Sequence, residues 1–580
     1  MNDEQEEQKE QADYNYDIDG QHLFSSNYND LEIGKTIASE KFLNNMDSFW
    51  FALNENTIIN SFDFVSVDNF QNIKTIGIVK ELQAVMLSDS NLAERVLDID
   101  LAKKKPTYTI TAQPCNNFRR GITVAKVAVM TNTVIGIGKT NAKVGSIGMP
   151  VGIGKPVKFA TAEEIIQALG IPEMRNPIPA GIIQMTNGLQ VPISLDLSYL
   201  VGPDTAHVNA SGISGNMKTS YLLFLLQSAY QKLGKNNDLA IIIFNTKEED
   251  LLHIDKENAT TKESNKKLLN ILNLDIEPFN NVTYFLPRGK DGKPNSVHIP
   301  QLSKTYSYEL EDIYDRLELL FQQTSDPHYN LSSIINYIYE SWPIKDKSGE
   351  DIRTWTDLFE FRDYPQEIIT HKSTLLHFLG TVQRFRKSSM FIDHRMTSIY
   401  LGKEMRRIKP GDIFVIDIAT ISALEEQAFI VGDVMKTIDE MYSERYYSDI
   451  DDNEVIKPKY IFIFIDEINR FLPKSIPNER MSAVAEQIMK TVIAGKSRGT
   501  ILFSAQQFKS GVDNALHENT GMHVTAKLGI SELSTTSYVM IDETTRMNIV
   551  RLNKGEIVMI HSAFRHPIKI MFPISSFKRA

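Results

Sequence analysis

A lysine and a threonine at the start of a helix are the residues whose types and spacing point most directly to chemistry. In HVNASGISGNMKTSYLLFLL (207–226), an apolar strand is expected to run into a glycine-containing loop and then into an amphipathic helix. Backbone N–H groups of such a loop and of the helix N-terminus converge on phosphate oxygens. In this arrangement Lys218 is expected to contact the β and γ phosphates of a nucleoside triphosphate, while the Thr219 hydroxyl binds Mg²⁺.

The predicted phosphate-binding residues belong to the loop and to the first helical turn: Gly212, Ser214, Gly215, Asn216, Met217, Lys218, Thr219 and Ser220. The two glycines fit the spacing of the consensus loop. Met217 departs from the consensus, which has glycine directly before the lysine. A positive φ at this position would strain methionine, because methionine carries a Cβ atom. The alternative interpretation is a surface turn that precedes an ordinary helix.

Two adjacent carboxylates follow another apolar run, YIFIFIDEINRF (460–471). Buried carboxylates are costly unless they face a cation or a ligand. Asp466 is expected to hold Mg²⁺ through water, and Glu467 to orient and polarise the water that attacks the γ phosphate. Helix N-termini also favour acidic residues, so a pair that only caps the next helix is the alternative.

A basic turn and another apolar strand follow in TVIAGKSRGTILFSAQQF (491–508). In multimeric P-loop motors an arginine often completes the site of the neighbouring subunit. Arg498 is the candidate for that role, with Lys496 as second choice, and Gln506 at the strand end is the candidate γ-phosphate sensor. The alternatives are a solvated loop arginine and a simple strand terminus. Lys218, Glu467, Arg498 and Gln506 are therefore the predicted catalytic residues, and Thr219 and Asp466 the predicted metal ligands.

Composition narrows the class of protein. The net charge is 62 − 73 = −11, which argues against a simple basic nucleic-acid binder but permits a locally basic channel inside an assembly. No apolar run approaches the roughly 20 residues that cross a bilayer, and no signal peptide is evident. The single cysteine, Cys115, cannot form an internal disulfide, and no Cys/His cluster indicates zinc. These features favour a cytoplasmic protein with no membrane partner.

Three regions of the chain differ in amino-acid composition and in the pattern of apolar residues. Residues 1–55 form an acidic, partly disordered N-terminal segment, with a short helix expected over 33–53. Residues 56–178 contain short β-branched runs between Gly, Pro and Asn, which predicts a small all-β barrel or sandwich. Residues 179–580 predict an α/β domain with a mostly parallel sheet, interrupted by a helical insertion at about 252–400. Its buried strands are expected in HVNASG, LAIIIFNT, DIFVIDI, KYIFIFID, GTILFSAQ and EIVMIHS.

In order and strand context, these motifs resemble the HerA/FtsK superfamily of hexameric translocating ATPases, in particular HerA-like (DUF87-type) proteins of bacterial anti-phage defence systems. The segments that carry the resemblance are residues 178–220, IIIFNTKEEDLLHID (241–255), IFIDEINRF (463–471), GKSRGTILFSAQQF (495–508) and GEIVMIHSAFRHPIKIMFP (555–573). The resemblance implies a RecA-like P-loop core behind a HAS-barrel-like assembly domain. In the second of these segments, the family tends to carry Asn or Asp followed by Lys.

The same resemblance implies a homo-hexameric ring that hydrolyses ATP with Mg²⁺ between subunits and passes double-stranded DNA through its pore, as a translocase or helicase-like motor. It also implies an effector partner, such as a nuclease or a Sir2-like NAD-hydrolysing enzyme. The alternatives are a weakly hydrolysing hexameric scaffold that organises its effector, favoured by Met217 and the negative charge, and a protein-moving or conjugation-type motor. The sequence gives no sign of an intrinsic nuclease. It shows no metal-binding carboxylate cluster outside the acidic pair and no catalytic His arrangement.

Two basic stretches are candidates for pore contacts with phosphates, TVQRFRKSS and KEMRRIKPGD. Their cationic residues are Arg384, Arg386, Lys387, Lys403, Arg406, Arg407 and Lys409. The alternative for each is a solvated helix face that balances an acidic chain.

Overall fold

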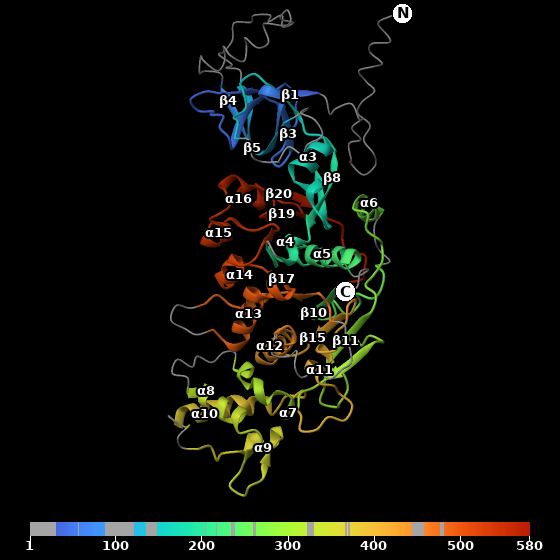
Figure 1. Cartoon of the computed structure of the whole chain (residues 1–580), viewed down its shortest axis with the longest axis vertical. Helices are drawn as coiled ribbons and strands as arrows, with labels where there is room; N and C mark the ends of the chain where they lie inside the picture. Colours follow the sequence, from blue (N-terminus) through green and yellow to red (C-terminus); the bar gives the residue numbers. More distant parts are fainter. Residues whose placement is uncertain are drawn as a thin grey trace, which may run out of the picture.

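A barrel, a large sheet and a helical subdomain follow one another along the long axis of the molecule (Figure 1). The structure is a computed structural model. It describes residues 31–55, 57–86, 121–134, 148–202, 205–215, 217–233, 238–258, 263–321, 330–365, 368, 372–443, 457–475 and 481–579. Asn216, Cys115 and residues 1–30 of the predicted N-terminal segment lie outside these residues. Among the described residues, no helix combines the length and the apolar character needed to cross a bilayer.

The predicted barrel is confirmed as a closed, wholly antiparallel barrel with strand order β1-β2-β5-β4-β3-β6. Its strands are β1 (Glu32–Ile37), β2 (Ser48–Leu53), β3 (Phe64–Asp68), β4 (Ile73–Met86), β5 (Gly121–Val134) and β6 (Pro156–Phe159). The short helix α3 (Ala162–Ala168) follows and begins with a capping box between Thr161 and Glu164. Closure leaves the barrel without a free strand edge.

The helix predicted over residues 33–53 is wrong, because this segment supplies the barrel strands β1 and β2. Phe49 and Phe51 are fully buried in the barrel interior, on alternate positions of β2. Asn45 bends the chain between the strands, where its side-chain oxygen accepts hydrogen bonds from the backbone N–H groups of Asp47 and Ser48. The barrel therefore begins at Glu32 instead of residue 56.

A single twelve-stranded sheet organises the rest of the chain, in the order β12-β11-β15-β10-β16-β17-β9-β18-β19-β20-β7-β8. Its strands are β7 (Pro177–Gln184), β8 (Gln190–Asp196), β9 (Val208–Ser211), β10 (Leu239–Asn245), β11 (Val282–Pro287), β12 (Ser303–Tyr306), β15 (Ile413–Asp417), β16 (Tyr460–Ile465), β17 (Thr500–Gln506), β18 (Met522–Thr525), β19 (Glu556–His561) and β20 (Ile568–Met571). Neighbouring strands from β12 to β18 in this order pair in parallel. The pairs from β18 to β8 are antiparallel. The predicted mixed α/β class and every predicted buried strand are confirmed.

Helices cover both faces of the parallel strands, which explains why these strands read as continuous apolar runs. Along β16, Phe462 and Phe464 pack into the same core as α5 (Lys218–Leu233), while Ile463 packs on the other side with α12 (Leu424–Met441) and α13 (Ala483–Arg498). Further helices are α4 (Ser198–Val201), α6 (Glu263–Ile271), α11 (Leu401–Met405), α14 (Asn514–Glu518), α15 (Ile530–Leu533) and α16 (Glu543–Val550).

The insertion predicted at about 252–400 is only partly helical, because β11 and β12 within it are strands of the main sheet. The helical part contains α7 (Leu310–Ile313), the 3₁₀ segment η5 (Tyr314–Leu320), α8 (Asn330–Glu340), α9 (Trp355–Glu360) and α10 (Lys372–Phe385), with the two-stranded ribbon β13 (Ile344–Lys345) and β14 (Asp351–Ile352). These elements form the lower end of the molecule in Figure 1.

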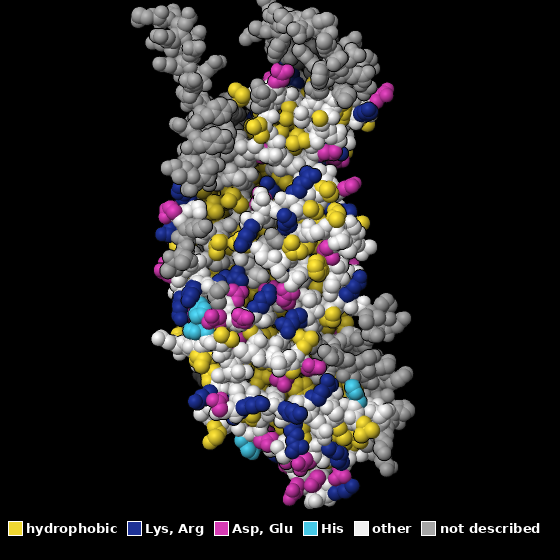
Figure 2. Space-filling model, turned by 180° about the vertical axis from the view of Figure 1, so that it is seen from behind, with side chains coloured by type: hydrophobic (Ala, Val, Ile, Leu, Met, Phe, Trp, Pro, Cys, Tyr) yellow, Lys and Arg dark blue, Asp and Glu magenta, His cyan; other side chains and the backbone are white. Residues whose placement is uncertain are grey.

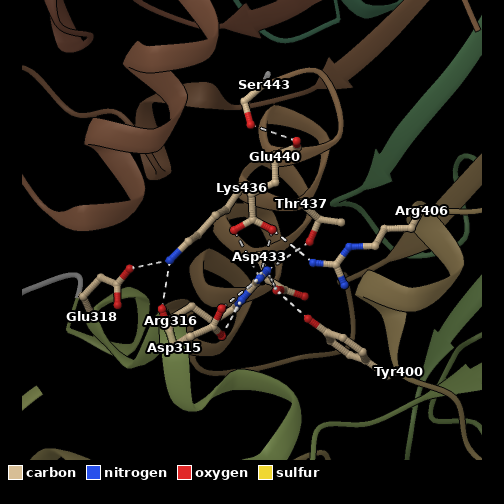
Figure 3. A network of polar contacts seen from close by, with 10 residues as sticks. All are labelled: Asp315, Arg316, Glu318, Tyr400, Arg406, Asp433, Lys436, Thr437, Glu440 and Ser443. Carbon is tan, nitrogen blue, oxygen red and sulfur yellow. Dashed lines mark hydrogen bonds and ion pairs between the residues drawn. The ribbon is translucent and has the colours of Figure 1, made fainter. Parts of the chain in front are cut away.

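A buried arginine joins the helical subdomain to α12 (Figure 3). Arg316 of η5 is 2% exposed, and its guanidinium donates hydrogen bonds to Asp433 at 2.8 Å and to Thr437 at 3.0 Å. It also donates to Glu440 at 3.1 Å, and Tyr400 donates to Asp433 at 3.3 Å. Removing one partner of a buried charge pair leaves the other uncompensated, so this network fixes η5 against α12.

Candidate nucleotide site

The loop between β9 and α5 contains two residues in the left-handed region of backbone conformation. Gly215 and Met217 both have positive φ values, 81° and 63°. The sequence-based concern about Met217 is therefore justified, since a residue with a Cβ atom occupies a left-handed position. The Met217 side chain is partly buried and packs against the hydrophobic core that α5 shares. The loop residues Ser214 and Gly215 are exposed, as a ligand-binding loop needs.

Lys218 is the first residue of α5 and is only 4% exposed. Its Nζ lies 4.0 Å from Oε1 of Glu467. Burial lowers the pKa of Lys218 by more than the nearby carboxylates of Asp466 and Glu467 raise it. A buried ammonium of this kind gains from any additional anionic partner, because the low dielectric strengthens its attraction to negative charge.

The predicted metal ligands lie together. The Thr219 hydroxyl donates a hydrogen bond to Oδ2 of Asp466 at 3.2 Å, although the two residues come from α5 and from the end of β16. Asp466 is 3% exposed, and its Oδ1 accepts a hydrogen bond from the backbone N–H of Glu467 at 2.9 Å. Glu467 has a φ of 53°, a strained backbone of the kind that gathers at functional sites.

Lys247 is a site residue that was not among the predicted ones. It follows β10, which is the direct neighbour of β16, and its Nζ lies 2.8 Å from Asp466 Oδ2 and 3.3 Å from Glu467 Oε1. Burial lowers the pKa of Lys247, but the charges of Asp466 and Glu467 outweigh burial and the pKa is raised. The signal in the sequence was the Asn-Thr-Lys at the end of an apolar strand, because neighbouring parallel strands end at the same edge.

Gln506 ends β17 and is fully buried. Its amide forms a reciprocal pair with Asn209 of β9: Gln506 Nε2 donates to Asn209 Oδ1 at 2.7 Å, and Asn209 Nδ2 donates to Gln506 Oε1 at 2.9 Å. Asn209 also donates to Ser504 Oγ at 2.8 Å. The predicted sensor is thereby tied to the strand that leads into the phosphate-binding loop.

Arg498 does not lie with the other predicted site residues. It ends α13 directly before β17, whereas Gln506 and Asp466 lie at the carboxyl ends of β17 and β16. The length of β17 separates the two edges by roughly 20 Å. The Arg498 guanidinium forms an ion pair with Asp439 of α12. Within its own chain, Arg498 therefore faces away from Lys218 and Asp466.

Ser220 has a partner on the C-terminal segment. Its hydroxyl accepts a hydrogen bond from Arg579 at 2.9 Å, and Arg579 also makes two hydrogen bonds to Asp250, at 2.9 and 2.5 Å. Asp250 lies three positions after Lys247. Through Arg579, the C-terminal segment therefore contacts both the first turn of α5 and the turn after β10. Arg579 had no recognisable motif in the sequence.

Several of the basic residues considered as pore contacts are engaged in ion pairs. Arg384, Arg386, Arg406 and Arg407 pair with Glu425, Glu360, Glu440 and Glu404, at 3.5, 3.9, 3.0 and 3.3 Å. Figure 2 shows Lys and Arg side chains interspersed with acidic ones over the face that it presents, without a single large basic patch. For these four arginines the pattern favours the balanced-surface alternative over a phosphate-binding stripe.

The residues at this edge fit a nucleoside triphosphate with Mg²⁺. Hydroxyl and carboxylate oxygens are ligands that Mg²⁺ accepts, and Thr219 and Asp466 already bring one of each within 3.2 Å. The buried Lys218 and the N-terminus of α5 supply positive charge and N–H donors for phosphate oxygens.

Comparison with known proteins adds only distant likenesses. No protein-family model matches the chain, and no curated protein matches it either. Among solved structures, the bacterial conjugative coupling protein TrwB in its unbound monoclinic form is 11% identical with a TM-score of 0.39, over 67% of this chain and 89% of that chain. TrwB in complex with ADP and Mg²⁺ is 11% identical over the same shares, with a TM-score of 0.38. The genome packaging NTPase B204 from Sulfolobus turreted icosahedral virus 2 in complex with ATP-γS is 7% identical over 30% of this chain and 72% of that chain, with a TM-score of 0.21. Because these TM-scores are low, the nucleotide site rests on its own geometry.

Proposed function

We propose that this chain is a P-loop ATPase of the HerA/FtsK superfamily, HerA-like branch, that hydrolyses ATP to ADP and phosphate. The observation that carries the proposal is the meeting of Lys218, Thr219, Asp466 and Glu467 at one edge of a parallel sheet, with Thr219 bonded to Asp466 at 3.2 Å and Lys218 4.0 Å from Glu467. A buried lysine, a helix N-terminus, a hydroxyl and two carboxylates are the set of groups that phosphoryl transfer to water uses.

Strand order supports a RecA-like core. The strand of the phosphate-binding loop, β9, and the strand of the acidic pair, β16, are separated by β17, which ends in Gln506. The order β18-β9-β17-β16-β10 therefore places a polar strand end between the loop and the acidic pair. In this proposal Gln506 responds to the γ phosphate, and its paired amide with Asn209 connects that response to β9.

Each residue has a distinct role in the proposed reaction. Glu467 orients the attacking water and accepts its proton as the oxygen bonds to the γ phosphorus and the bond to the ADP oxygen breaks. Lys218 stabilises the charge on the phosphate oxygens, and loop N–H groups hold the phosphates. Thr219 and Asp466 would hold Mg²⁺, which supplies Lewis-acid stabilisation of phosphate charge when bound. Before a metal ion binds, Lys247 neutralises the negative charge of Asp466 and Glu467.

The assembly part of the proposal is a cytoplasmic homo-hexamer in which ATP sites lie between subunits. Arg498 is consistent with it, because a catalytic role for Arg498 is possible only at the site of a neighbour, given its distance from the site of its own chain. The ring would translocate double-stranded DNA and dock an effector, such as a nuclease or a Sir2-like enzyme, in anti-phage defence or DNA processing. The barrel, at residues 32–159, is the proposed assembly domain.

The second candidate function is a hexameric scaffold that hydrolyses ATP weakly and organises its effector. The positive φ of Met217 favours it, because the Cβ atom of methionine makes this loop conformation costlier to hold than glycine would. A protein-moving or conjugation-type motor is a third candidate.

Steady-state ATP hydrolysis by the purified chain, with and without double-stranded DNA, tests the proposal. We expect turnover that is lost in Lys218→Ala and Glu467→Gln and kept in Lys232→Ala, an exposed lysine at the far end of α5. Stimulation by DNA would favour the translocase, and negligible turnover by an intact ring would favour the scaffold. Unchanged turnover in Lys218→Ala would remove the site assignment.

A further inference from the structure

Three side chains with metal-binding atoms lie close together beyond the ends of β10 and β11. Glu249, His253 and His298 each offer one ligand atom, and these atoms all lie within 4.8 Å of one another. Glu249 Oε2 and His253 Nε2 are 3.1 Å apart, and the two imidazole rings are 4.1 Å apart between centroids. The cluster shares no residue with the nucleotide site.

The cluster contains buried nitrogen atoms without a hydrogen-bond partner. His253 is 6% exposed, and its Nδ1 has no partner among the described residues. His298 Nε2 is likewise buried and has no partner there. A buried polar atom without a hydrogen-bond partner destabilises the fold. The unpaired atom of His298, in a cluster with a second imidazole and a carboxylate, is explained if a further group binds between these side chains.

The donor atoms of the cluster, two imidazole nitrogens and a carboxylate oxygen, suit a cation as that group. The neutral imidazole is the form that binds metals, because its free nitrogen lone pair is the ligand. Glu249 supplies the negative charge that partly compensates a divalent ion.

We propose that Glu249, His253 and His298 form a binding site for a divalent transition metal of the zinc class, separate from the Mg²⁺ position at Thr219 and Asp466. Two imidazoles and a carboxylate are ligands that suit Zn²⁺ and bind Mg²⁺ poorly. Tetrahedral coordination at Zn–N distances of about 2.0–2.1 Å brings ligand atoms to about 3.3 Å from one another. The three ligand atoms lie within 4.8 Å of one another, so small side-chain movements bring them to this spacing.

The position of the cluster gives the metal a structural role near the ATPase site. Glu249 and His253 lie in the turn that also carries Lys247 and Asp250, which contact Asp466 and Arg579. His298 lies in the segment after β11, where Ser296 donates a hydrogen bond to Asp417 at 2.5 Å. A bound metal would link the turn after β10 to the segment after β11, over the carboxyl ends of β10 and β15.

The experiment uses the full-length chain, stripped with a chelator and then dialysed against Zn²⁺. Metal per chain is measured by elemental analysis, and affinity by competition with a chromophoric chelator. We expect one zinc per chain, loss of at least about tenfold in affinity for His298→Gln and Glu249→Gln, and no change for His394→Gln, an exposed histidine outside the cluster. Thermal unfolding and circular dichroism establish that the variants are folded.

Asp466→Asn separates this site from the nucleotide site. The proposal requires that Asp466→Asn retains the zinc and that Zn²⁺ raises the melting temperature of the wild type but not of folded His298→Gln. Substoichiometric zinc in the wild type, or zinc retained by His298→Gln and lost from Asp466→Asn, would overturn it. Because none of these measurements uses ATP hydrolysis, the result is independent of the proposed ATPase.

Discussion

Lys247 and Thr219 donate hydrogen bonds to the same oxygen, Oδ2 of Asp466, at 2.8 and 3.2 Å. Lys247 belongs to the turn after β10, whereas Asp466 follows β16, so two neighbouring parallel strands bring the charges together. The carboxylate assigned to Mg²⁺ is therefore shared with an ammonium. The Lys247 side chain is 48% exposed, which leaves it free to withdraw toward solvent when a stronger cation arrives.

Lys247→Met is expected to lower the Mg²⁺ concentration that supports half-maximal nucleotide binding. Removing the ammonium leaves Asp466 and Glu467 with uncompensated negative charge, which attracts a divalent cation. For a partly exposed pair the gain is about 1 kcal/mol, or roughly fivefold in Mg²⁺ affinity. Titration of a fluorescent ATP analogue at a series of Mg²⁺ concentrations measures it. Lys232→Met is the matched control, and a higher Mg²⁺ requirement in Lys247→Met would contradict the competition.

Met217→Gly is expected to be more stable than Met217→Ala by about 1 kcal/mol. Both variants lose the packing of the methionine side chain on the core, but only glycine adopts the φ of 63° without strain. Chemical denaturation of the two variants side by side gives the difference. If alanine were the more stable replacement, position 217 would not be left-handed in solution.

The nucleotide site was largely predictable, because its residues follow strongly apolar strands or begin a helix. Lys218, Thr219, Asp466 and Glu467 are local signals of this kind, and the structure brings them together. Lys247 was visible only as the end of another strand, since its partner depends on β10 lying beside β16. Asn209 and Arg579 could not be predicted, because their partners come from strand order and from the return of the C-terminal segment.

The fold was predictable where periodicity had one interpretation. The runs at β10, β15, β16 and β17 are too apolar for anything but buried elements. The segment 33–53 has apolar residues at spacings that fit a helix as well as a strand pair. Only the closure of the barrel, which needs β1 and β2, selects the strand pair. Glu249, His253 and His298 were separated along the sequence, so no zinc motif was recognisable.

Arg498→Ala and Asp439→Ala are expected to have different effects on hydrolysis, although they break the same ion pair. Both side chains are partly exposed, so the pair contributes less than about 1 kcal/mol to folding. If Arg498 serves a neighbouring site, its loss lowers ATP turnover by about 10³-fold, while Asp439→Ala leaves the arginine available and preserves turnover. Mixing Arg498→Ala with Glu467→Gln chains measures the action between subunits. Equal loss of turnover in Arg498→Ala and Asp439→Ala would instead assign a purely structural ion pair.

His207 is expected to make the chain acid-sensitive. Its Nδ1 accepts a hydrogen bond from the Leu502 N–H at 2.9 Å, and its Nε2 donates to the Val492 carbonyl oxygen at 2.9 Å, so the bonded imidazole is neutral. Burial lowers the pKa of His207 from 6.5 to about 4. Between these values the unfolded chain binds a proton that the folded chain does not. Stability is therefore lost as the pH falls from about 6.5 toward 4.

His207→Gln is expected to reduce the loss of unfolding free energy between pH 7 and pH 5 by about 2 kcal/mol, since 1.36 kcal/mol corresponds to one pKa unit. Urea unfolding at the two pH values, for the wild type and the variant, gives this difference. Burial also lowers the pKa of five other histidines, His298, His517, His523, His561 and His566, but they are present in both proteins and cancel. The exposed His394→Gln should keep the full wild-type loss. An identical loss in His207→Gln would mean that His207 is protonated in the folded chain, which would break its bond from Leu502.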